Sequence, residues 1–416
     1  MDMAKPKIRF KGYTDEWEQR KLGDVIDDMY NGQTPSRNKS EYWNGTIKWL
    51  SSGELNRGTV YDSIETITEE GQKAANLKIV PKGTFVMAIT GLEAAGTRGN
   101  CALLGFDTTL NQSCMALFPK QEMLTSEFLF QWYRKVGEEY GINYTQGTKQ
   151  QSYNAELIKI LPISLPSVVE QRKISSYLSQ LDHLITLHQR KCEQAKKLKK
   201  YMLQKMFPQN GQKVPEIRFK GFTDDWEQRK LNEVTVKIGS GKTPSGGKSA
   251  YVDTGIPLIR SQNVNDDKVD FNDIVYIDEL TDESMANSRV FTNDVLLNIT
   301  GASIGRSAVY KGLDQANVNQ HVCIVRPTDG YCPDFVQLNL ASDSGQKQIE
   351  SSQAGGGREG LNFQQIGKMH FSFPTLDEQK QIGGYFNALD NLITLHQQKC
   401  DELKNIKKFM LQNMFI

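Results

Sequence analysis

An internal duplication is the feature of this sequence that most constrains its fold. Residues 8–22 read IRFKGYTDEWEQRKL and residues 217–231 read IRFKGFTDDWEQRKL, which agree at 13 of 15 positions. Residues 167–208 and 375–416 agree at 22 of 42 positions, again about 208 residues apart. Between these borders the copies share only short sequences: Thr-Pro-Ser (34–36, 243–245), Ile-Thr-Gly (89–91, 299–301) and Asn-Gln (111–112, 319–320). Repeated sequence indicates repeated structure, so we expect one scaffold that carries two different binding surfaces; the alternative is a duplication whose interiors have simply diverged.

The borders of the repeat predict six segments: an N-terminal repeat segment (1–22), a first globular domain (23–166), a central long helix (167–208), a linker with a repeat segment (209–231), a second globular domain (232–374) and a C-terminal long helix (375–416). Each interior combines β-branched runs, at 84–89 and 294–299, with helical patches at 126–136 and 334–342. Turns rich in Gly, Asn and Pro separate them. This mixture predicts two α+β domains with small, loop-rich sheets.

The closing segments of both copies read as long helices. Ser167-x-x-Glu170 and Thr375-x-x-Glu378 each follow a proline, which is the pattern of a capping box. Apolar residues then recur at spacings of three and four for about four heptads, which predicts two helices that pair with each other within the chain as a coiled coil. The residues assigned to helix pairing are Leu178, Leu181, Ile185, Cys192, Met202, Phe386, Leu389, Ile393, Cys400 and Met410. The pattern itself does not choose between a parallel and an antiparallel pair.

The charge distribution is informative where the net charge of +1 is not. Residues 23–166 carry 13 basic and 16 acidic side chains, residues 232–373 carry 12 and 17, and residues 167–208 carry 9 and 3. A nucleic-acid partner therefore requires basic side chains of the interiors to cluster on one face. The residues assigned to such a face are Arg37, Lys39, Arg98, Lys149, Gln150, Lys242, Lys248, Arg306 and Arg358.

No catalytic or metal-binding constellation is recognisable, so no catalytic residue and no metal ligand is assigned. The six cysteines never form a Cys-x-x-Cys pair, which disfavours zinc modules and disulfide frameworks. Gly239-Ser-Gly-Lys-Thr243 resembles the end of a phosphate-binding loop, but it lacks the first glycine, with Val236 in that place, and Pro244 follows at once. No stretch has the length and apolarity of a membrane span or a signal peptide, so we expect a cytoplasmic protein.

Several of these motifs in combination resemble the specificity subunit of type I restriction–modification systems over essentially the whole chain. The most specific is the Leu-Pro-x-x-x-Glu-Gln-x-x-Ile entry to the first helix, from Leu165 to Ile174, which the second copy repeats with Phe373 in place of leucine. Leu-x-x-x-Asp-x-x-Ile follows at 178–185, with Phe386 in place of leucine at 386–393. The Trp-Glu-x-x-Lys-Leu openings, the Thr-Pro-Ser turns and the Asn-Gln pairs fit as well.

The resemblance implies a non-catalytic subunit that recognises double-stranded DNA. Each interior would be a target recognition domain for one half of a bipartite, asymmetric site. The paired helices would set the spacing and dock two modification subunits, and two restriction subunits would complete the enzyme. S-adenosylmethionine, ATP and Mg²⁺ are then expected on the partner subunits and no cofactor on this chain. A bipartite target favours antiparallel helices.

Two other classes of function compete with this interpretation. A duplicated helical adaptor that binds proteins is consistent with the acidic interiors and the near-neutral net charge. A self-sufficient enzyme is disfavoured, because the sequence contains no recognisable methyltransferase or nuclease motif.

Overall fold

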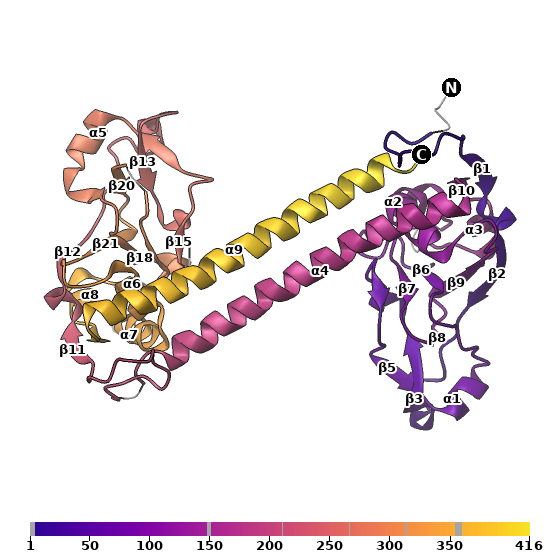
Figure 1. Ribbon diagram of the computed structural model, residues 1–416, viewed down its shortest axis with the longest axis horizontal. Helices are drawn as coiled ribbons and strands as arrows, with labels where there is room; N and C mark the ends of the chain where they lie inside the picture. The colour runs from indigo at the N-terminus through magenta and orange to yellow at the C-terminus, as the bar shows by residue number, and fades with distance from the viewer. Residues whose placement is uncertain (1–4, 148–150, 210, 266, 313, 354–359) are drawn as a thin grey trace. The chain divides into compact units, whose positions relative to one another are not determined.

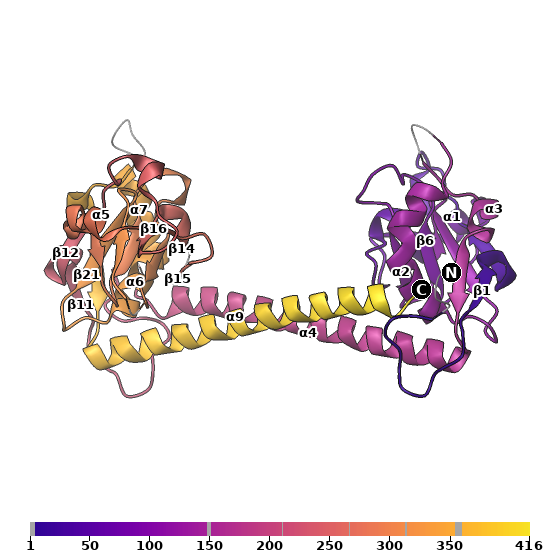
Figure 2. The same cartoon turned by 90° about the horizontal axis from the view of Figure 1, so that it is seen from above.

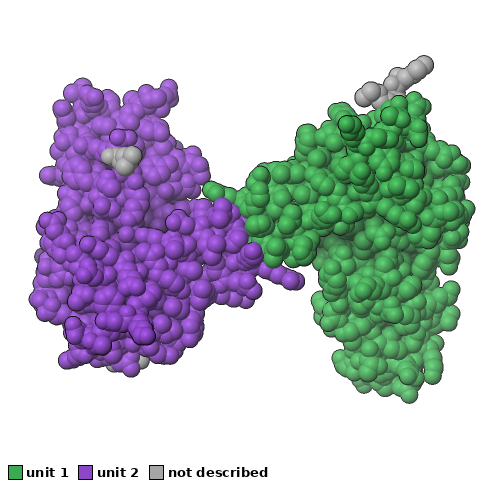
Figure 3. All heavy atoms as spheres, viewed as in Figure 1, with its two compact units in different colours: residues 1–189, 398–416 green, residues 190–397 purple. Residues whose placement is uncertain are grey.

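The computed structural model describes residues 5–147, 151–209, 211–265, 267–312, 314–353 and 360–416. The chain forms two compact units (Figure 1 and Figure 3). The first combines both ends of the sequence, and the second is built from its middle. Unit 1 comprises residues 1–189 and 398–416, and unit 2 comprises residues 190–397. Two 38-residue helices, α4 (Val168–Lys205) and α9 (Leu376–Asn413), each contribute one part to either unit. The predicted long helices are therefore confirmed.

In its described residues, unit 1 contains two sheets and a short ribbon. A five-stranded sheet has the order β2-β9-β6-β7-β4, and a three-stranded sheet has the order β5-β3-β8. The strands of the first are β2 (Ile26–Asn31), β9 (Cys114–Pro119), β6 (Phe85–Ala88), β7 (Cys101–Leu104) and β4 (Thr59–Val60). The strands of the second are β5 (Glu65–Ile67), β3 (Trp43–Leu50) and β8 (Thr109–Leu110), and the ribbon pairs β1 (Glu18–Lys21) with β10 (Pro162–Leu165). The helices are α1 (Glu69–Ala74), α2 (Ser126–Asn143) and α3 (Ala155–Lys159).

Unit 2 repeats this plan with two four-stranded sheets, ordered β12-β21-β18-β19 and β16-β13-β20-β17. Their strands are β12 (Thr235–Ser240), β21 (Val322–Pro327), β18 (Val295–Asn298), β19 (Ser307–Val309), β16 (Val275–Ile277), β13 (Ile256–Ile259), β20 (Ala316–Val318) and β17 (Arg289–Val290). Two-stranded ribbons pair β11 (Glu227–Lys230) with β22 (His370–Phe373) and β14 (Val264–Asn265) with β15 (Lys268–Val269). The helices are α5 (Glu279–Ser284), α6 (Pro333–Ala341), α7 (Asp343–Gln353) and α8 (Phe363–Gly367).

Local sequence explains where these elements form. Every residue of β6 and β18 is buried, as expected for central strands that are apolar in all positions but the last of β18, Asn298. Helix α2 begins after Thr125, whose side chain accepts a hydrogen bond from the Phe128 amide, as an N-cap residue does. The predicted strands at 84–89 and 294–299 and the helices at 126–136 and 334–342 are confirmed, and so is the α+β class.

Within each unit, one part of α4 packs antiparallel against one part of α9. In unit 2, the Cys192 thiol lies 3.8 Å from the Ile393 carbonyl, and Lys199 donates to Asp390 at 2.7 Å. As the residue number of the contacting residue rises along α4, that of its partner on α9 falls, so the two helices run in opposite directions. In unit 1, Lys407 bonds Asp182, which is the same contact between the duplicated positions. The intramolecular coiled coil is thus antiparallel within each unit, and equivalent residues of the two copies make the same contact.

The start of each long helix is anchored to two other segments of its own unit. Glu170 and Glu378 are 1% and 0% exposed, and each forms a bidentate ion pair with an arginine of the repeated N-terminal sequence. The distances are 2.7 and 2.8 Å to Arg9 and the same to Arg218. The capping-box prediction is therefore only half right. The Glu170 amide does donate to the Ser167 hydroxyl at 3.4 Å, but both carboxylates bind arginine because burial favours a charged partner over an amide.

The glutamine that follows each of these glutamates binds the globular domain. The Gln171 side chain accepts a hydrogen bond from the Thr125 amide and donates to the Met123 and Pro166 carbonyls. Gln379 does the same for the Cys332 amide and the Pro374 carbonyl. The Glu-Gln motif thus ties three segments together at the entry to each helix. In Figure 2, each globular domain lies along one flank of the helix portions of its own unit. The boundaries of the six predicted segments stay predictions.

Among the residues that the structure describes, no helix has the length and apolarity needed to cross a membrane.

Candidate nucleic-acid interface

The short sequences that the two interiors share meet at one corner of unit 1. The Thr34 hydroxyl of the Thr-Pro-Ser turn bonds the Gln112 side chain of the Asn-Gln pair. The Ile89 amide, at the start of Ile-Thr-Gly, donates to the Ser113 carbonyl at 2.9 Å. Thr90 in turn forms an isolated antiparallel β-bridge with Ser152, which lies beyond the loop that follows α2. We call this set, Thr34, Thr90, Gln112 and Ser152, the shared corner of unit 1.

Unit 2 has the same corner with different side chains around it. Thr243 bonds Gln320, and the Ile299 amide donates to the His321 carbonyl at 3.0 Å. Thr300 bridges to Gly360 and also hydrogen-bonds the His321 ring at 2.5 Å. The shared corner of unit 2 is therefore Thr243, Thr300, Gln320 and Gly360. In both units the glutamine side chain is exposed, so the corner is accessible to a ligand.

Two glycines allow the backbone to approach closely at these corners. A Cβ atom on Gly32 would lie 1.9 Å from the Leu110 carbonyl oxygen, and one on Gly241 would lie 1.7 Å from that of Val318. Any side chain at either position would clash with the backbone. The glycine of the Gly-Ser-Gly-Lys-Thr sequence therefore has a structural reason that involves no nucleotide: Gly241 lies against the backbone of β20, where only glycine fits.

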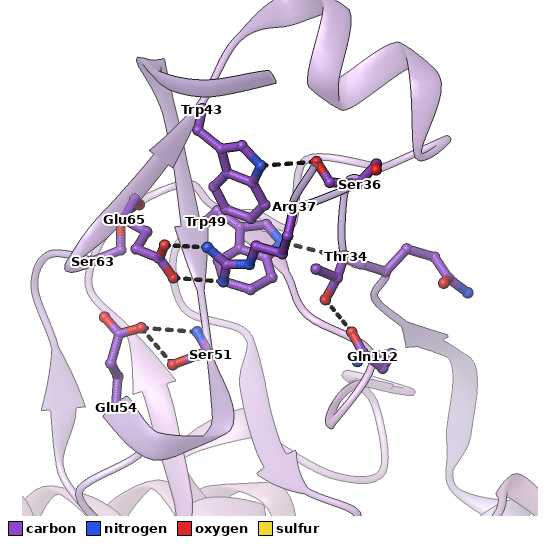
Figure 4. A network of polar contacts seen from close by, with 11 residues as sticks. Thr34, Ser36, Arg37, Trp43, Trp49, Ser51, Glu54, Ser63, Glu65 and Gln112 are labelled. Carbon is purple, nitrogen blue, oxygen red and sulfur yellow. Dashed lines mark hydrogen bonds and ion pairs between the residues drawn. The ribbon is translucent and has the colours of Figure 1, made fainter. Parts of the chain in front are cut away.

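The Thr-Pro-Ser turn of unit 1 is followed by an arginine that stacks on tryptophan rings and forms an ion pair with a carboxylate (Figure 4). The Arg37 guanidinium lies 3.7 Å from the Trp43 ring centroid and 5.1 Å from that of Trp49. It forms a bidentate ion pair with Glu65, with one of the two contacts at 2.8 Å. The guanidinium lowers the pKa of Glu65, and the carboxylate raises the pKa of Arg37, so both remain charged. This geometry favours a role in holding the turn against β3.

The other residues assigned to a basic face lie on several elements. Lys39 and Lys248 occupy equivalent exposed positions of the two Thr-Pro-Ser turns; Lys39 donates to the Tyr42 hydroxyl at 3.0 Å. Lys242 lies on the same turn of unit 2 and points to the Ser284 carbonyl at 3.4 Å. The structure thus brings these three lysines beside the corners.

Two of the assigned arginines lie elsewhere. Arg98 donates to the Leu92 and Glu93 carbonyls and packs where a side chain on Gly141 of α2 would sit. Arg306 is exposed in the wall of a cavity beside α4 and α9. Lys149, Gln150 and Arg358 lie outside the described residues. The assignment of all nine residues to DNA contact stays a prediction.

Most residues assigned to helix pairing are buried in the cores of the units. Leu178, Leu181 and Ile185 share the core of unit 1 with Cys400, while Phe386 and Leu389 belong to that of unit 2. Cys192 is 4% exposed, and Met202, Ile393 and Met410 are half-buried. The seam between the helices is thus continuous with the core of each globular domain. Among the described residues, no group of three or more His, Cys, Asp or Glu side chains is placed to bind a metal ion.

The sequence interpretation missed a second apolar stripe on both helices. Leu184 and Leu187 of α4 are 39% and 36% exposed, and the equivalent Leu392 and Leu395 of α9 are 42% and 60% exposed. Further along, Leu198 and Tyr201 are 43% and 49% exposed, and Phe409, equivalent to Tyr201, is 55% exposed. If the buried seam is numbered a and d, these residues fall at g and c. Their repetition in both copies was visible in the sequence and could have identified them.

This stripe lies on the flank of the helices opposite the globular domains. Beside the seam, Asp182 contacts Arg134 of the domain of unit 1, and the equivalent Asp390 lines the cavity of unit 2; both fall at position e. Positions e and g flank the seam on opposite sides in a helix of 3.6 residues per turn. We call the set of exposed Leu184, Leu187, Leu198, Tyr201, Leu392, Leu395 and Phe409 the outer stripe.

Comparison with known proteins gives consistent matches. A family model described as type I restriction modification DNA specificity domain matches residues 14–197 and again 223–405. The MjaVIII specificity subunit of a type I restriction enzyme from Methanocaldococcus jannaschii is 23% identical over 95% of this chain and 91% of that protein. The EcoR124I/EcoR124II specificity subunit from Escherichia coli is 28% identical over 42% of this chain and 43% of that protein. The crystal structure of a type I restriction–modification S subunit from M. genitalium superposes with a TM-score of 0.66 at 15% identity, over 99% of each chain.

Proposed function

Because the chain belongs to the family of type I restriction modification DNA specificity domains, we propose that each unit recognises one half of a bipartite, asymmetric DNA site through its shared corner. The shared corners carry this proposal. Each combines a fixed polar joint, such as Thr34 with Gln112, with surroundings that differ between the units. Two recognition surfaces on one scaffold are what a target with two dissimilar halves requires.

The side chains at the corners have the chemistry to contact bases. An exposed glutamine amide can donate and accept hydrogen bonds at the same time, which suits adenine in the major groove. Lys39, Lys242 and Lys248, which lie on the adjoining turns, would contact phosphates and position the corner on the duplex. These contacts also offset the acidic surplus of both interiors, since the lysines share the side of the domain that carries the corner.

The test is a map of methylated adenines in a genome that carries the complete system. Gln112→Ala should change or relax recognition of one half-site only, and Gln320→Ala should change the other half-site only. Lys73→Gln, an exposed lysine of α1 paired to Glu69, is the matched control and should leave the methylated motif unchanged. If either glutamine variant altered both halves, or neither half, recognition by independent corners would be refuted.

The alternative of a protein-binding adaptor is not supported by the family to which the chain belongs. It predicts that salt-sensitive binding to a single split DNA sequence is absent. A gel-shift series with the purified chain, alone and with a modification subunit, distinguishes the two functions directly.

We further propose that the outer stripe docks two modification subunits, one on each unit. Exposed leucine and aromatic side chains at equivalent positions provide two matching apolar surfaces, and such surfaces are typical of protein interfaces. The chain itself would be non-catalytic. Methyl transfer with S-adenosylmethionine and cleavage with ATP and Mg²⁺ would belong to the modification subunits and to two restriction subunits. The two shared helices would set the spacing of the half-sites.

Leu392→Ser combined with Leu395→Ser should remove one of the two modification subunits without unfolding the chain, because both side chains are already exposed to solvent. Native mass spectrometry of the complex measures the loss. The equivalent change at Leu184 and Leu187 should remove the other subunit, and both changes together should abolish assembly. A complex that kept both subunits in all these variants would place the docking surface elsewhere.

A further inference from the structure

Unit 2 contains a cavity of about 1070 Å³ between its globular domain and its portions of α4 and α9. One wall consists of the two helices, and the other includes Asp267, strand β15, residues 304–312 and α6. Its size is that of a binding site for a small molecule. Recognition through the shared corners does not use it.

The charges that line this cavity do not balance. Six cations line it, Lys196, Lys199, Lys200, Lys268, Arg306 and Lys311, but only three carboxylates, Asp267, Asp334 and Asp390. All three carboxylates are occupied. Lys199, which is 11% exposed, bridges Asp390 at 2.7 Å and Asp267, and Lys311 bonds Asp334 at 2.8 Å.

Three of the cations have no such partner. In the part of the chain that the structure describes, Lys200, Lys268 and Arg306 form no ion pair and no side-chain hydrogen bond, while Lys196 contacts Glu193 outside the cavity at 3.4 Å. The same walls include apolar residues such as Leu203, Val269 and Ile304. Low-dielectric walls concentrate the field of uncompensated charges, so an anion would be attracted into this cavity.

Comparison with unit 1 explains why the cavity exists. Phe128 and Phe335 are equivalent, because each packs against the repeated tryptophan, Trp17 or Trp226. Counting six residues along the helix from each places Arg134 of α2 at the position of Ala341, which lines the cavity. In unit 1 the Arg134 side chain occupies this position and bonds Asp182 at 2.6 Å.

At the next position, too, unit 1 has a long cationic side chain and unit 2 a short one. Lys135 of α2 donates to the carbonyls of Phe415 and Ile416 at 3.1 and 2.8 Å, and its equivalent in unit 2 is the short side chain of Ser342. Unit 2 therefore lacks two long cationic side chains that unit 1 has beside the helices. Asp182 pairs with both Arg134 and Lys407, whereas the equivalent Asp390 pairs with Lys199. The position that Arg134 fills in unit 1 opens onto the cavity at Ala341, and this cavity is lined by cations from other elements.

We propose that the cavity of unit 2 binds phosphoryl groups, through Lys200, Lys268 and Arg306. Guanidinium and ammonium groups are the usual protein ligands of phosphate, and three of them around one cavity can contact several of its oxygens. The phosphoryl groups could come from a free phosphorylated molecule or from the DNA backbone; the second source rests on the proposed function.

The probe is inorganic tripolyphosphate, titrated into the full chain by isothermal calorimetry. Ala341→Arg introduces the unit 1 side chain, which should fill the cavity and pair with Asp390, so binding should weaken at least tenfold. Arg306→Gln changes an exposed side chain without touching the core and should weaken binding several-fold. Lys82→Gln, on the surface of unit 1, is the control and should bind as the wild type does. Equal tripolyphosphate affinity in all four proteins, or no binding by the wild type, would overturn the proposal.

The same variants identify the source of the phosphate. If the DNA backbone supplies it, Arg306→Gln should reduce the slope of log K against log salt by about one without changing the preferred sequence. If DNA affinity is unchanged while tripolyphosphate binding is lost, the ligand is a free phosphorylated molecule. Failure of the wild type to prefer any DNA sequence would refute the proposed function and leave the tripolyphosphate result standing.

Discussion

Replacing Arg218 by methionine tests how strongly the repeated N-terminal segment anchors the long helix. The Glu378 carboxylate is 0% exposed and its two oxygens bind Arg218 at 2.7 and 2.8 Å. Two unit charges about 4 Å apart at an effective dielectric constant of about 20 attract with about 4 kcal/mol. Removal of one partner of such a buried pair costs about 3 to 5 kcal/mol, because the remaining charge stays buried without compensation. We expect Arg218→Met to lower the free energy of unfolding of unit 2 by this amount.

The effect is measured by unfolding the protein in urea and monitoring amide hydrogen exchange in the first turns of α9. A double variant, Arg218→Met with Glu378→Leu, should recover most of the loss, because neither charge is then buried alone. Arg229→Met is the control: that arginine pairs with Glu227 at the exposed surface, at 41% and 66% exposure, and should unfold as the wild type does. If Arg218→Met and Arg229→Met behaved alike, the anchoring role of the buried pair would be wrong. Arg9→Met should reproduce the effect in unit 1, whose Arg9–Glu170 pair has the same geometry.

Three further predictions concern the corners and the helix pair. Gly241→Ala should destabilise unit 2 by about 1 to 3 kcal/mol through overpacking against the Val318 carbonyl, whereas Gly53→Ala, with its nearest contact at 3.9 Å, should not; thermal unfolding compares them. Burial raises the pKa of Asp182 and Asp390 above the ordinary value of 3.8, so the native state binds their protons more tightly than the unfolded chain does. The free energy of unfolding should therefore rise as the pH falls from the raised pKa towards 3.8, and Asp390→Asn should flatten this rise in urea titrations at several pH values. Inserting seven residues into α4 between 190 and 195 should alter the spacing of the methylated half-sites, and an unchanged spacing would contradict the proposal that the helices set it.

The surroundings of some assigned residues could not be foreseen from sequence, because their partners are distant along the chain. Arg37 carries a charge on a turn, as a phosphate contact would, but Trp43 and Glu65 occupy its guanidinium. Arg306 carries the same charge, yet it lines a cavity beside the helices. Charge is a property of one residue, whereas the availability of that charge depends on which side chains the fold brings to it.

Local and periodic information was sufficient for part of the architecture. The duplication, the two long helices and the buried positions of Leu178 and Phe386 follow from spacing along the chain, because a helix repeats its contacts every three to four residues. Only the tertiary structure decided the antiparallel direction, the meeting of Thr34 with Gln112, and the pairing of Arg9 with Glu170, 161 residues away. It also decided that Ala341 opens a cavity where Arg134 closes the equivalent space. Such contacts join segments that are remote in sequence, and no local spacing encodes which of them meet.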